Sequence, residues 1–212
     1  MTAVTLEQGA ETLGLALSDA QRDQLHRYLA MLQKWNKVCN LTAVRDPAEM
    51  LTHHLLDSLA VIPPLMRQRG NDHEFALLDV GSGGGLPGAV IAICCPQARV
   101  SCVDTVAKKA AFQQQVALEL RLPNLRGLHA RVETLVEPQD VVCSRAFASL
   151  QNFVQWSEPS LGQGGVWMAM KGKDPADELA ALPPHVQVFH VEQIQVPGLD
   201  ADRCIVWMQP SP

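Results

Sequence analysis

The chain of 212 residues is poor in charge, and it lacks the long apolar runs that mark membrane proteins. Charged residues make up only 18% and hydrophobic residues 47% of the sequence, a balance typical of a folded globular chain. No run of about eighteen apolar residues is present, so we expect no membrane-spanning helix. The first residues lack both a basic stretch and a continuous apolar stretch, so we expect no signal peptide and a cytoplasmic protein.

The sequence also lacks C-x-x-C pairs, although it contains six cysteines. Zinc sites and redox motifs usually pair cysteines at close spacing, so we interpret these residues as buried free thiols of a reducing compartment. They are Cys39, Cys94, Cys95, Cys102, Cys143 and Cys204. The net charge of −5 argues against a protein that coats naked nucleic acid, although it does not exclude a local basic face.

Residues 1–72 are predicted to form a helical segment that packs on the rest of the chain. Ser18 and Gln21 form a capping box, and apolar residues follow them at helical spacing. A second N-cap occurs at Asp46, and its helix should end near Pro63-Pro64. Residues 67–74, which are polar with one glycine, predict a linker.

Residues 73–212 are predicted to form an α/β domain with a mostly parallel, doubly wound, Rossmann-like sheet. Short apolar strands alternate with helices, which is typical of parallel βαβ units. The chain then ends in two extended runs, 186–197 and 202–209, which predict an antiparallel hairpin at one sheet edge. The predicted strands before the hairpin are 75–80, 98–104, 125–129, 140–144 and 165–170, and two predicted helices are 89–93 and 106–120.

The glycine-rich stretch GSGGGLPG, residues 81–88, follows the first predicted strand. Ligands of open α/β sheets lie outside the carboxyl ends of the strands, so this loop predicts a nucleotide site. Gly83, Gly85 and Gly88 match the dinucleotide pattern G-x-G-x-x-G, whereas Gly81, Gly83 and Gly85 match the G-x-G-x-G of many methyltransferases. The absence of G-K-[ST] excludes a triphosphate P-loop.

Asp79, two residues before Gly81, favours the methyltransferase pattern. A carboxylate here would repel a pyrophosphate, but it suits the cationic amino and sulfonium groups of S-adenosylmethionine. The alternative role of Asp79 is to cap the amides of the loop. The terminal hairpin also favours a methyltransferase, because dehydrogenases usually continue with further βαβ units and a substrate domain.

Residues after the second and third strands suit an adenosine. Asp104 ends the second strand and could accept hydrogen bonds from both ribose hydroxyls. Val132 and Glu133 follow the third strand, where the Val132 amide and the Glu133 side chain could bind the edge of the adenine. NAD and S-adenosylmethionine share this nucleoside, so these three residues do not separate the two cofactors.

Five motifs occur in order along the chain: N-L-T-A-V-R-D at 40–46, H-x-L-D-S-L at 54–59, D-V-G-S-G-G-G-L-P-G at 79–88, S-R-A-F-A-S-L at 144–150 and M-K-G at 170–172. Together they resemble the RsmG (GidB) family of small-subunit rRNA guanine-N7 methyltransferases. The resemblance implies methyl transfer from S-adenosylmethionine to N7 of a guanosine in 16S rRNA, at nucleotide 527. It further implies cofactor contacts at Gly81, Leu86, Val132, Glu133 and Arg145.

Guanine N7 carries a lone pair and no proton, so its methylation needs no general base. We therefore expect no catalytic acid or base, only residues that orient the reactants, an effect that can supply about 7–11 kcal/mol. The candidates for orienting the RNA are basic residues at the carboxyl ends of strands: Lys108, Lys109, Arg131, Arg145 and Lys171.

His53, His54 and Asp57 could form part of a metal site on one helix. Two ligands without a third make a poor site, so we expect no metal and instead a packing or hydrogen-bonding role against the glycine loop. Phe147 could stack on a flipped base, with core packing as the alternative.

Two other functions stay open on the residues alone: an NAD-dependent oxidoreductase, and a non-catalytic module that binds S-adenosylmethionine. The expected partner is the 16S rRNA, and the small number of basic residues favours an assembled small subunit over free RNA as the substrate. Nothing in the sequence requires more than a monomer.

Overall fold

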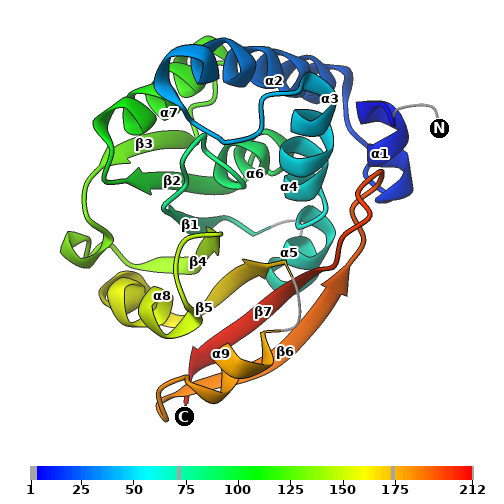
Figure 1. The fold of residues 1–212 in the computed structure, drawn as a ribbon. Helices are drawn as coiled ribbons and strands as arrows, with labels where there is room; N and C mark the ends of the chain where they lie inside the picture. The colour runs from blue at the N-terminus through cyan, green and yellow to red at the C-terminus, as the bar shows by residue number, and fades with distance from the viewer. Residues whose placement is uncertain (1–3, 71–72, 173–174, 212) are drawn as a thin grey trace.

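The computed structural model describes residues 4–70, 73–172 and 175–211. Within them, seven strands form one sheet in the order β3-β2-β1-β4-β5-β7-β6 (Figure 1). The first five strands pair in parallel, while β7 runs antiparallel to both β5 and β6. The strands are β1 (Phe75–Val80), β2 (Ala98–Asp104), β3 (Leu125–His129), β4 (Gln139–Arg145), β5 (Leu161–Lys171), β6 (Val186–Ile194) and β7 (Arg203–Pro210).

The predicted doubly wound sheet with a terminal antiparallel hairpin is therefore confirmed. Its strand order reverses between β1 and β4, because β2 and β3 lie on one side of β1 while β4 and β5 lie on the other. A crevice opens at the carboxyl ends of the strands at such a reversal.

The N-terminal helices follow the predicted caps, and the helix that begins after Asp46 ends at Leu59, near the predicted Pro63-Pro64. Ser18 caps α2 and exchanges hydrogen bonds with Gln21, and Asp46 caps α3 by accepting from two backbone N–H groups. Pro63 and Pro64 lie in the first turn of the next helix, α5, which tolerates proline because the N–H groups of a first turn have no partner within the helix. The segment consists of α1 (Leu6–Thr12), α2 (Asp19–Cys39), α3 (Pro47–Met50), the π-helix η1 (Leu51–Leu56), α4 (Asp57–Leu59) and α5 (Ile62–Arg69).

The expected linker at 67–74 is partly helical, since α5 continues to Arg69. The predicted boundary between the two parts of the chain falls at residue 72, and residues 71–72 lie outside the described residues. The remaining helical elements are α6 (Gly88–Cys94), α7 (Ala107–Glu119), the 3-10 turns η2 (Val132–Thr134) and η3 (Glu158–Ser160), α8 (Leu150–Ser157) and α9 (Ala176–Ala180).

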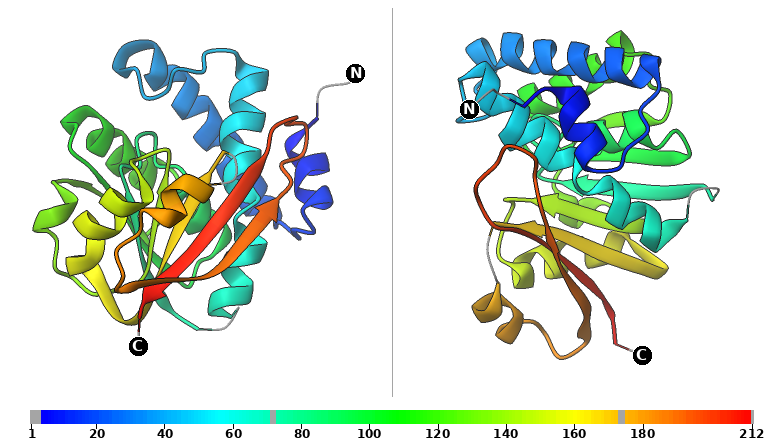
Figure 2. Two further views of the ribbon diagram at one scale, coloured as in Figure 1. Left: turned by 60° about the horizontal axis from the view of Figure 1, so that its bottom comes forward. Right: turned by 90° about the vertical axis from the view of Figure 1, so that its right-hand side faces the viewer.

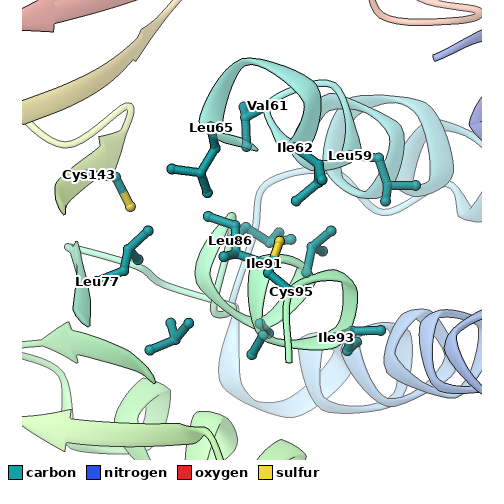
Figure 3. Packing of buried hydrophobic residues seen from close by; sticks show 14 of the residues in the cluster. Leu59, Val61, Ile62, Leu65, Leu77, Leu86, Ile91, Ile93, Cys95 and Cys143 are labelled. Carbon is teal, nitrogen blue, oxygen red and sulfur yellow. The ribbon is translucent and has the colours of Figure 1, made fainter. Parts of the chain in front are cut away.

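Helices cover both faces of the sheet (Figures 1 and 2). Strand residues alternate between the faces, so that Leu77 packs beneath α6 while its neighbour Leu78 packs on the side of α8. Side chains of α4 and α5, among them Leu59, Ile62 and Leu65, meet α6 in the larger of the two apolar clusters (Figure 3). The N-terminal helices therefore share a core with the sheet.

All six cysteines lie among the described residues and none forms a disulfide; four are buried, and Cys39 and Cys94 are half-buried. Burial raises the pKa of the Cys95 thiol to about 12, and it raises the pKa of the Cys102 and Cys143 thiols as well. These thiols therefore stay protonated at neutral pH and are poor nucleophiles.

Candidate functional site

The glycine loop crosses the carboxyl end of β1 in a conformation that requires glycine. Gly81, Gly83 and Gly85 have φ values of 65°, 56° and 79°. A Cβ atom at Gly81 would lie 2.2 Å from Cδ2 of Phe147, so this position also lacks space for a side chain. The loop is held from above by α2, where the buried Tyr28 hydroxyl donates to the Gly84 carbonyl at 2.6 Å.

Asp79 lies behind this loop, not in front of it. Its side chain is fully buried, and Oδ2 accepts a hydrogen bond from the Gly88 N–H at the start of α6, at 2.8 Å. Asp79 shares the sheet face of Leu77, because alternate strand residues point the same way, and this face is covered by α6. The structure thus places Asp79 in the capping role, and the expected contact with a cationic cofactor finds no support in its position.

Two of the cavities of the described chain adjoin each other at this edge of the sheet. One, of about 540 Å³, lies between the glycine loop and the N-terminal helices, and we call it the basic cavity. The other, of about 350 Å³, lies beyond the ends of β2 and β3, and we call it the Asp104 cavity. Gly81, Lys109 and Ala146 line both.

The Asp104 cavity brings together the residues that the sequence assigned to an adenosine. Asp104 accepts hydrogen bonds from the N–H groups of Gly83 (3.1 Å) and Val106 (2.9 Å). Val132 and Glu133 line the same cavity, and a hydrogen bond from Arg131 lowers the pKa of Glu133. The cavity therefore has acceptor groups that suit hydroxyl and amino donors.

Aromatic rings form another wall of the Asp104 cavity. Phe147 lies against Gly81 and meets Trp156 edge to face, with ring centroids 5.9 Å apart. Phe147 thus packs on a neighbouring ring while it also faces a cavity.

The basic residues predicted to orient RNA are only partly brought together. Lys109 lines both cavities, while its Nζ lies 3.6 Å from Oδ2 of Asp104. Arg131 lines the Asp104 cavity, whereas Lys108 is exposed and lies outside both. Lys171 lines the basic cavity, but its ammonium group is held by Glu178 at 2.8 Å.

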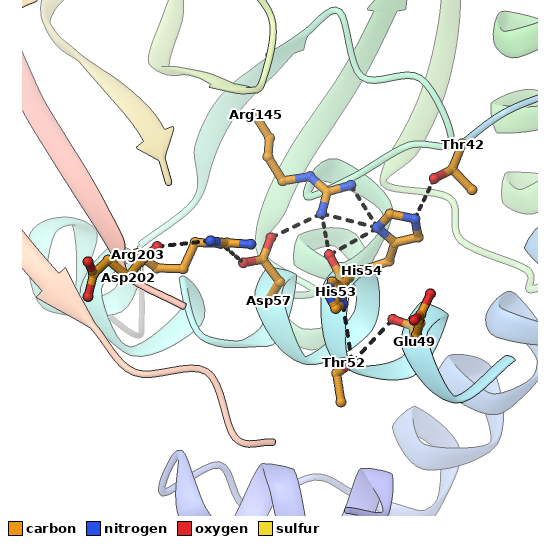
Figure 4. Close-up of polar contacts among 9 residues, drawn as sticks. All are labelled: Thr42, Glu49, Thr52, His53, His54, Asp57, Arg145, Asp202 and Arg203. Atoms are coloured by element: carbon orange, nitrogen blue, oxygen red, sulfur yellow. Dashed lines mark hydrogen bonds and ion pairs between the residues drawn. The ribbon is translucent and has the colours of Figure 1, made fainter. Parts of the chain in front are cut away.

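Arg145, at the end of β4, is bound by the π-helix η1 and the residue after it (Figure 4). Its Nη1 donates to the His53 carbonyl at 2.9 Å and to Oδ2 of Asp57 at 3.0 Å. Oδ1 of Asp57 accepts from Nε of Arg203, on β7, at 2.8 Å. We expected His53, His54 and Asp57 to meet the glycine loop. His53 and Asp57 instead bind Arg145, and His54 contacts Thr42, although all three line the basic cavity together with that loop.

His54 is neutral in this network. Its Nε2 lies 2.6 Å from the Thr42 hydroxyl, and burial together with the charge of Arg145 lowers its pKa to about 4. Arg203 is the site residue that the sequence reasoning missed. It lies 146 positions from Asp57 in the chain, and no local motif marks it.

Within the described ranges, no group of three or more His, Cys, Asp or Glu side chains is arranged to hold a metal ion. Of the helices in this part of the chain, none is both long and apolar enough to cross a bilayer.

The family model described as rRNA small subunit methyltransferase G (GidB) matches residues 21–206. A protein of Polaromonas sp. (strain JS666) named ribosomal RNA small subunit methyltransferase G is 66% identical over 207 residues, which cover 96% of this chain and 92% of that protein. A protein of the same name from Acidovorax sp. (strain JS42) is 66% identical over 212 residues, 97% of this chain and 94% of that one.

Among solved structures, a mutant of MtNAS in complex with S-adenosylmethionine has a TM-score of 0.60 at 13% identity, covering 100% of this chain and 86% of that one. This likeness shows the fold. The family match and the two relatives span nearly the whole sequence and agree with the five ordered motifs. The chain belongs to the rRNA small subunit methyltransferase G (GidB) family.

Proposed function

We propose that this protein transfers the methyl group of S-adenosylmethionine to N7 of a guanosine in the 16S rRNA of the small ribosomal subunit, at nucleotide 527. The observation that carries the proposal is the pair of adjoining cavities at the β1/β4 reversal, which share Gly81. One cavity suits a nucleoside and the other an anionic substrate, as a transfer from cofactor to RNA requires.

The residues of the Asp104 cavity fit the adenosine part of the cofactor. The Asp104 carboxylate would accept from the ribose hydroxyls, and Val132 and Glu133 would bind the adenine edge. Gly81, which has no room for a Cβ, would let the backbone approach the cofactor closely. Leu86 and Arg145 would contact the cofactor from the basic cavity.

The basic cavity suits RNA because of its charge. Of the described residues that line it, four are cationic and Asp57 is the one carboxylate, in a chain whose net charge is −5. Two of the four, Lys109 and Lys171, also pair with carboxylates outside the lining. The cationic residues are Lys109, Arg145, Lys171 and Arg203. Such side chains would hold phosphates and orient the RNA without specifying its sequence.

The bound cofactor supplies an electrophilic methyl group on a sulfonium. The chain's task is to hold guanine N7 in line with that methyl and to exclude water, since N7 has no proton to lose. His54 contacts Thr42 and stays neutral down to its pKa of about 4. The reaction needs no proton transfer from it, because N7 carries no proton.

The test is transfer of a labelled methyl group by the purified protein to small subunits from cells that lack it. We expect label in 16S rRNA at a base that becomes labile to strand cleavage, as 7-methylguanosine is, and mapping the cleavage identifies the nucleotide. Failure of transfer to both assembled subunits and free 16S rRNA would contradict the proposal.

We also propose that the protein acts as a cytoplasmic monomer on the assembled subunit. Light scattering of the purified protein should give the mass of one chain, 23.1 kDa. Faster methylation of free rRNA than of assembled subunits would count against the assembled substrate.

A further inference from the structure

The segment that binds Arg145 is a π-helix, a rare geometry that is frequently found at functional sites. η1 places the His53 carbonyl and the Asp57 carboxylate on the same side, toward the end of β4 (Figure 4). The Asp57 N–H donates to the Thr52 carbonyl five residues back, which is the wide turn of a π-helix. Arg145 is therefore bound by acceptors whose relative position depends on this turn.

Both oxygens of the Asp57 carboxylate accept hydrogen bonds from arginine side chains. It is only 3% exposed, and it uses one oxygen for Arg145 and the other for Arg203. A carboxylate this buried is stable only when its charge is paired and its oxygens accept hydrogen bonds. Because the two arginines come from β4 and β7, Asp57 fixes the N-terminal helices against two strands of the sheet.

The neighbouring hydrogen bonds leave part of the Arg145 guanidinium without an acceptor. The Thr42 hydroxyl accepts from the Val44 N–H and lies 2.6 Å from Nε2 of His54. The other ring nitrogen, Nδ1, lies 3.0 Å from the His53 carbonyl, and it lies 3.5 Å and 3.4 Å from Nη1 and Nη2 of Arg145. A carbonyl can only accept, so the shortest of these contacts makes Nδ1 the protonated nitrogen, and the two longer contacts to Arg145 are then not hydrogen bonds. Among the described residues, Nε and Nη2 of Arg145 then have no acceptor, although the side chain is only 19% exposed and lines the basic cavity.

We propose that Asp57 is a positioning residue: with the His53 carbonyl, it holds Arg145 so that Nε and Nη2 can bind an anionic oxygen group in the basic cavity. The inference rests on the proposed function, in which that group is the carboxylate of the cofactor or a phosphate of the RNA. A guanidinium held at one edge presents its other N–H groups as a fixed fork, which suits two oxygens of one anion.

The test is a double-mutant cycle with Asp57→Asn, Arg145→Gln and the double variant. For each we would measure the dissociation constant of S-adenosylmethionine and the kcat and KM of methyl transfer to small subunits. If Asp57 acts through Arg145, introducing Asp57→Asn into the wild type lowers kcat/KM by about 10²-fold, the size expected of a misplaced contact. Introducing it into the Arg145→Gln variant then causes little further loss of kcat/KM. Independent losses that multiply in the double variant overturn the inference.

Two further arms identify the anion. If the cofactor carboxylate is bound, decarboxylated S-adenosylmethionine binds the wild type more weakly than the intact cofactor does, and Asp57→Asn abolishes that discrimination. If an RNA phosphate is bound, Asp57→Asn leaves cofactor binding unchanged. In that variant the KM for the subunit rises and becomes less sensitive to salt than in the wild type. Unchanged values on both arms contradict the inference even when the wild type is active.

Glu137→Gln is the matched control, because this carboxylate pairs with Arg126 on the exposed surface before the amino end of β4, away from Arg145. It should keep wild-type kinetics. If Asp57→Asn fails to fold, Asp57→Glu tests the same point, since it keeps the charge but displaces Arg145 by one methylene. The inference is overturned if a folded Asp57→Glu variant keeps the cofactor binding and the kcat/KM of the wild type. Absence of methyl transfer by the wild type contradicts the proposed function instead.

Discussion

The buried carboxylate of Asp79 should make the stability of the fold depend on pH. Oδ2 of Asp79 accepts from the Gly88 N–H, while Oδ1 has no hydrogen-bond partner among the described residues. Burial raises the pKa of Asp79 from its ordinary value of 3.8 to about 7, although the Gly88 N–H and the charge of Arg145 act in the opposite direction. The folded protein therefore binds a proton that the unfolded chain releases between these two values.

Asp79→Asn should flatten the dependence of stability on pH. The pKa of Asp79 is higher in the folded protein than in the unfolded chain, so protonation of this group favours folding. Its contribution to the free energy of unfolding is therefore fully present below pH 4, and about a few kcal/mol of it is lost as pH rises toward 7. Urea unfolding at several pH values between 4 and 8 measures this. The exposed Glu137→Gln is the control, and an unchanged slope in Asp79→Asn would show that Asp79 is not the group responsible.

Gly81→Ala should weaken cofactor binding at least tenfold, because the new methyl group would overlap Phe147 in addition to straining the backbone. Gly164→Ala is the matched control: Gly164 also has a positive φ, of 72°, but a Cβ there meets nothing within 4 Å. Calorimetric titration of S-adenosylmethionine into both variants measures the difference. Equal loss of binding in both would mean that the overlap with Phe147 is unimportant.

At the scale of elements, α2 holds the glycine loop from the side opposite the sheet. The buried Tyr28 hydroxyl donates to the Gly84 carbonyl, and burial raises the pKa of Tyr28, so the phenol stays a donor over the accessible pH range. Leu32, one turn further along α2, lies against Gly84. Packing of this helix therefore determines where the loop carbonyls lie.

Tyr28→Phe should destabilise the fold by about 1–3 kcal/mol, because it leaves a buried carbonyl without its donor. It should also weaken cofactor binding, since the loop would lose a restraint. Thermal unfolding with and without S-adenosylmethionine measures both effects. Thr12→Val, which removes an exposed hydroxyl that donates to the Gln8 carbonyl, is the control and should change neither by more than about 0.5 kcal/mol.

At the scale of the whole molecule, the N-terminal helices and the sheet bury one continuous apolar cluster. Leu25 and Leu32 of α2 belong to the same cluster as Phe112 of α7 and Trp207 of β7. The two predicted parts of the chain are therefore joined by a core and by the Asp57 ion pairs, and we propose that they fold as one unit.

Native-state hydrogen exchange should then give the same opening free energy for the interior amides of α2 and of β1, with the same dependence on denaturant. Saturating S-adenosylmethionine should raise both together, by about 2.7 kcal/mol at a concentration one hundred times its Kd. Exchange of α2 through an opening that leaves β1 protected would show instead that the helical segment is a separate unit.

The sequence by itself determined the features that depend on near neighbours. Helix caps at Ser18 and Asp46 and the alternation of strands and helices arise from contacts within a few residues, and they are confirmed. Asp104, Val132 and Glu133 also line one cavity with Gly81, because parallel strands bring their carboxyl ends to one edge; their role toward a cofactor stays a prediction. The same local reasoning failed at the expected linker, residues 67–74, because α5 continues to Arg69 through polar residues that local composition alone does not assign to a helix.

Tertiary structure alone decided the rest. Asp79 lies beneath α6 because of the sheet face on which it falls, which spacing to Gly81 does not reveal. Asp57 meets Arg145 and Arg203 across 88 and 146 positions of sequence. Such contacts form when separate elements pack, and their partners are selected by geometry over the whole molecule, so no pattern of nearby residues encodes them.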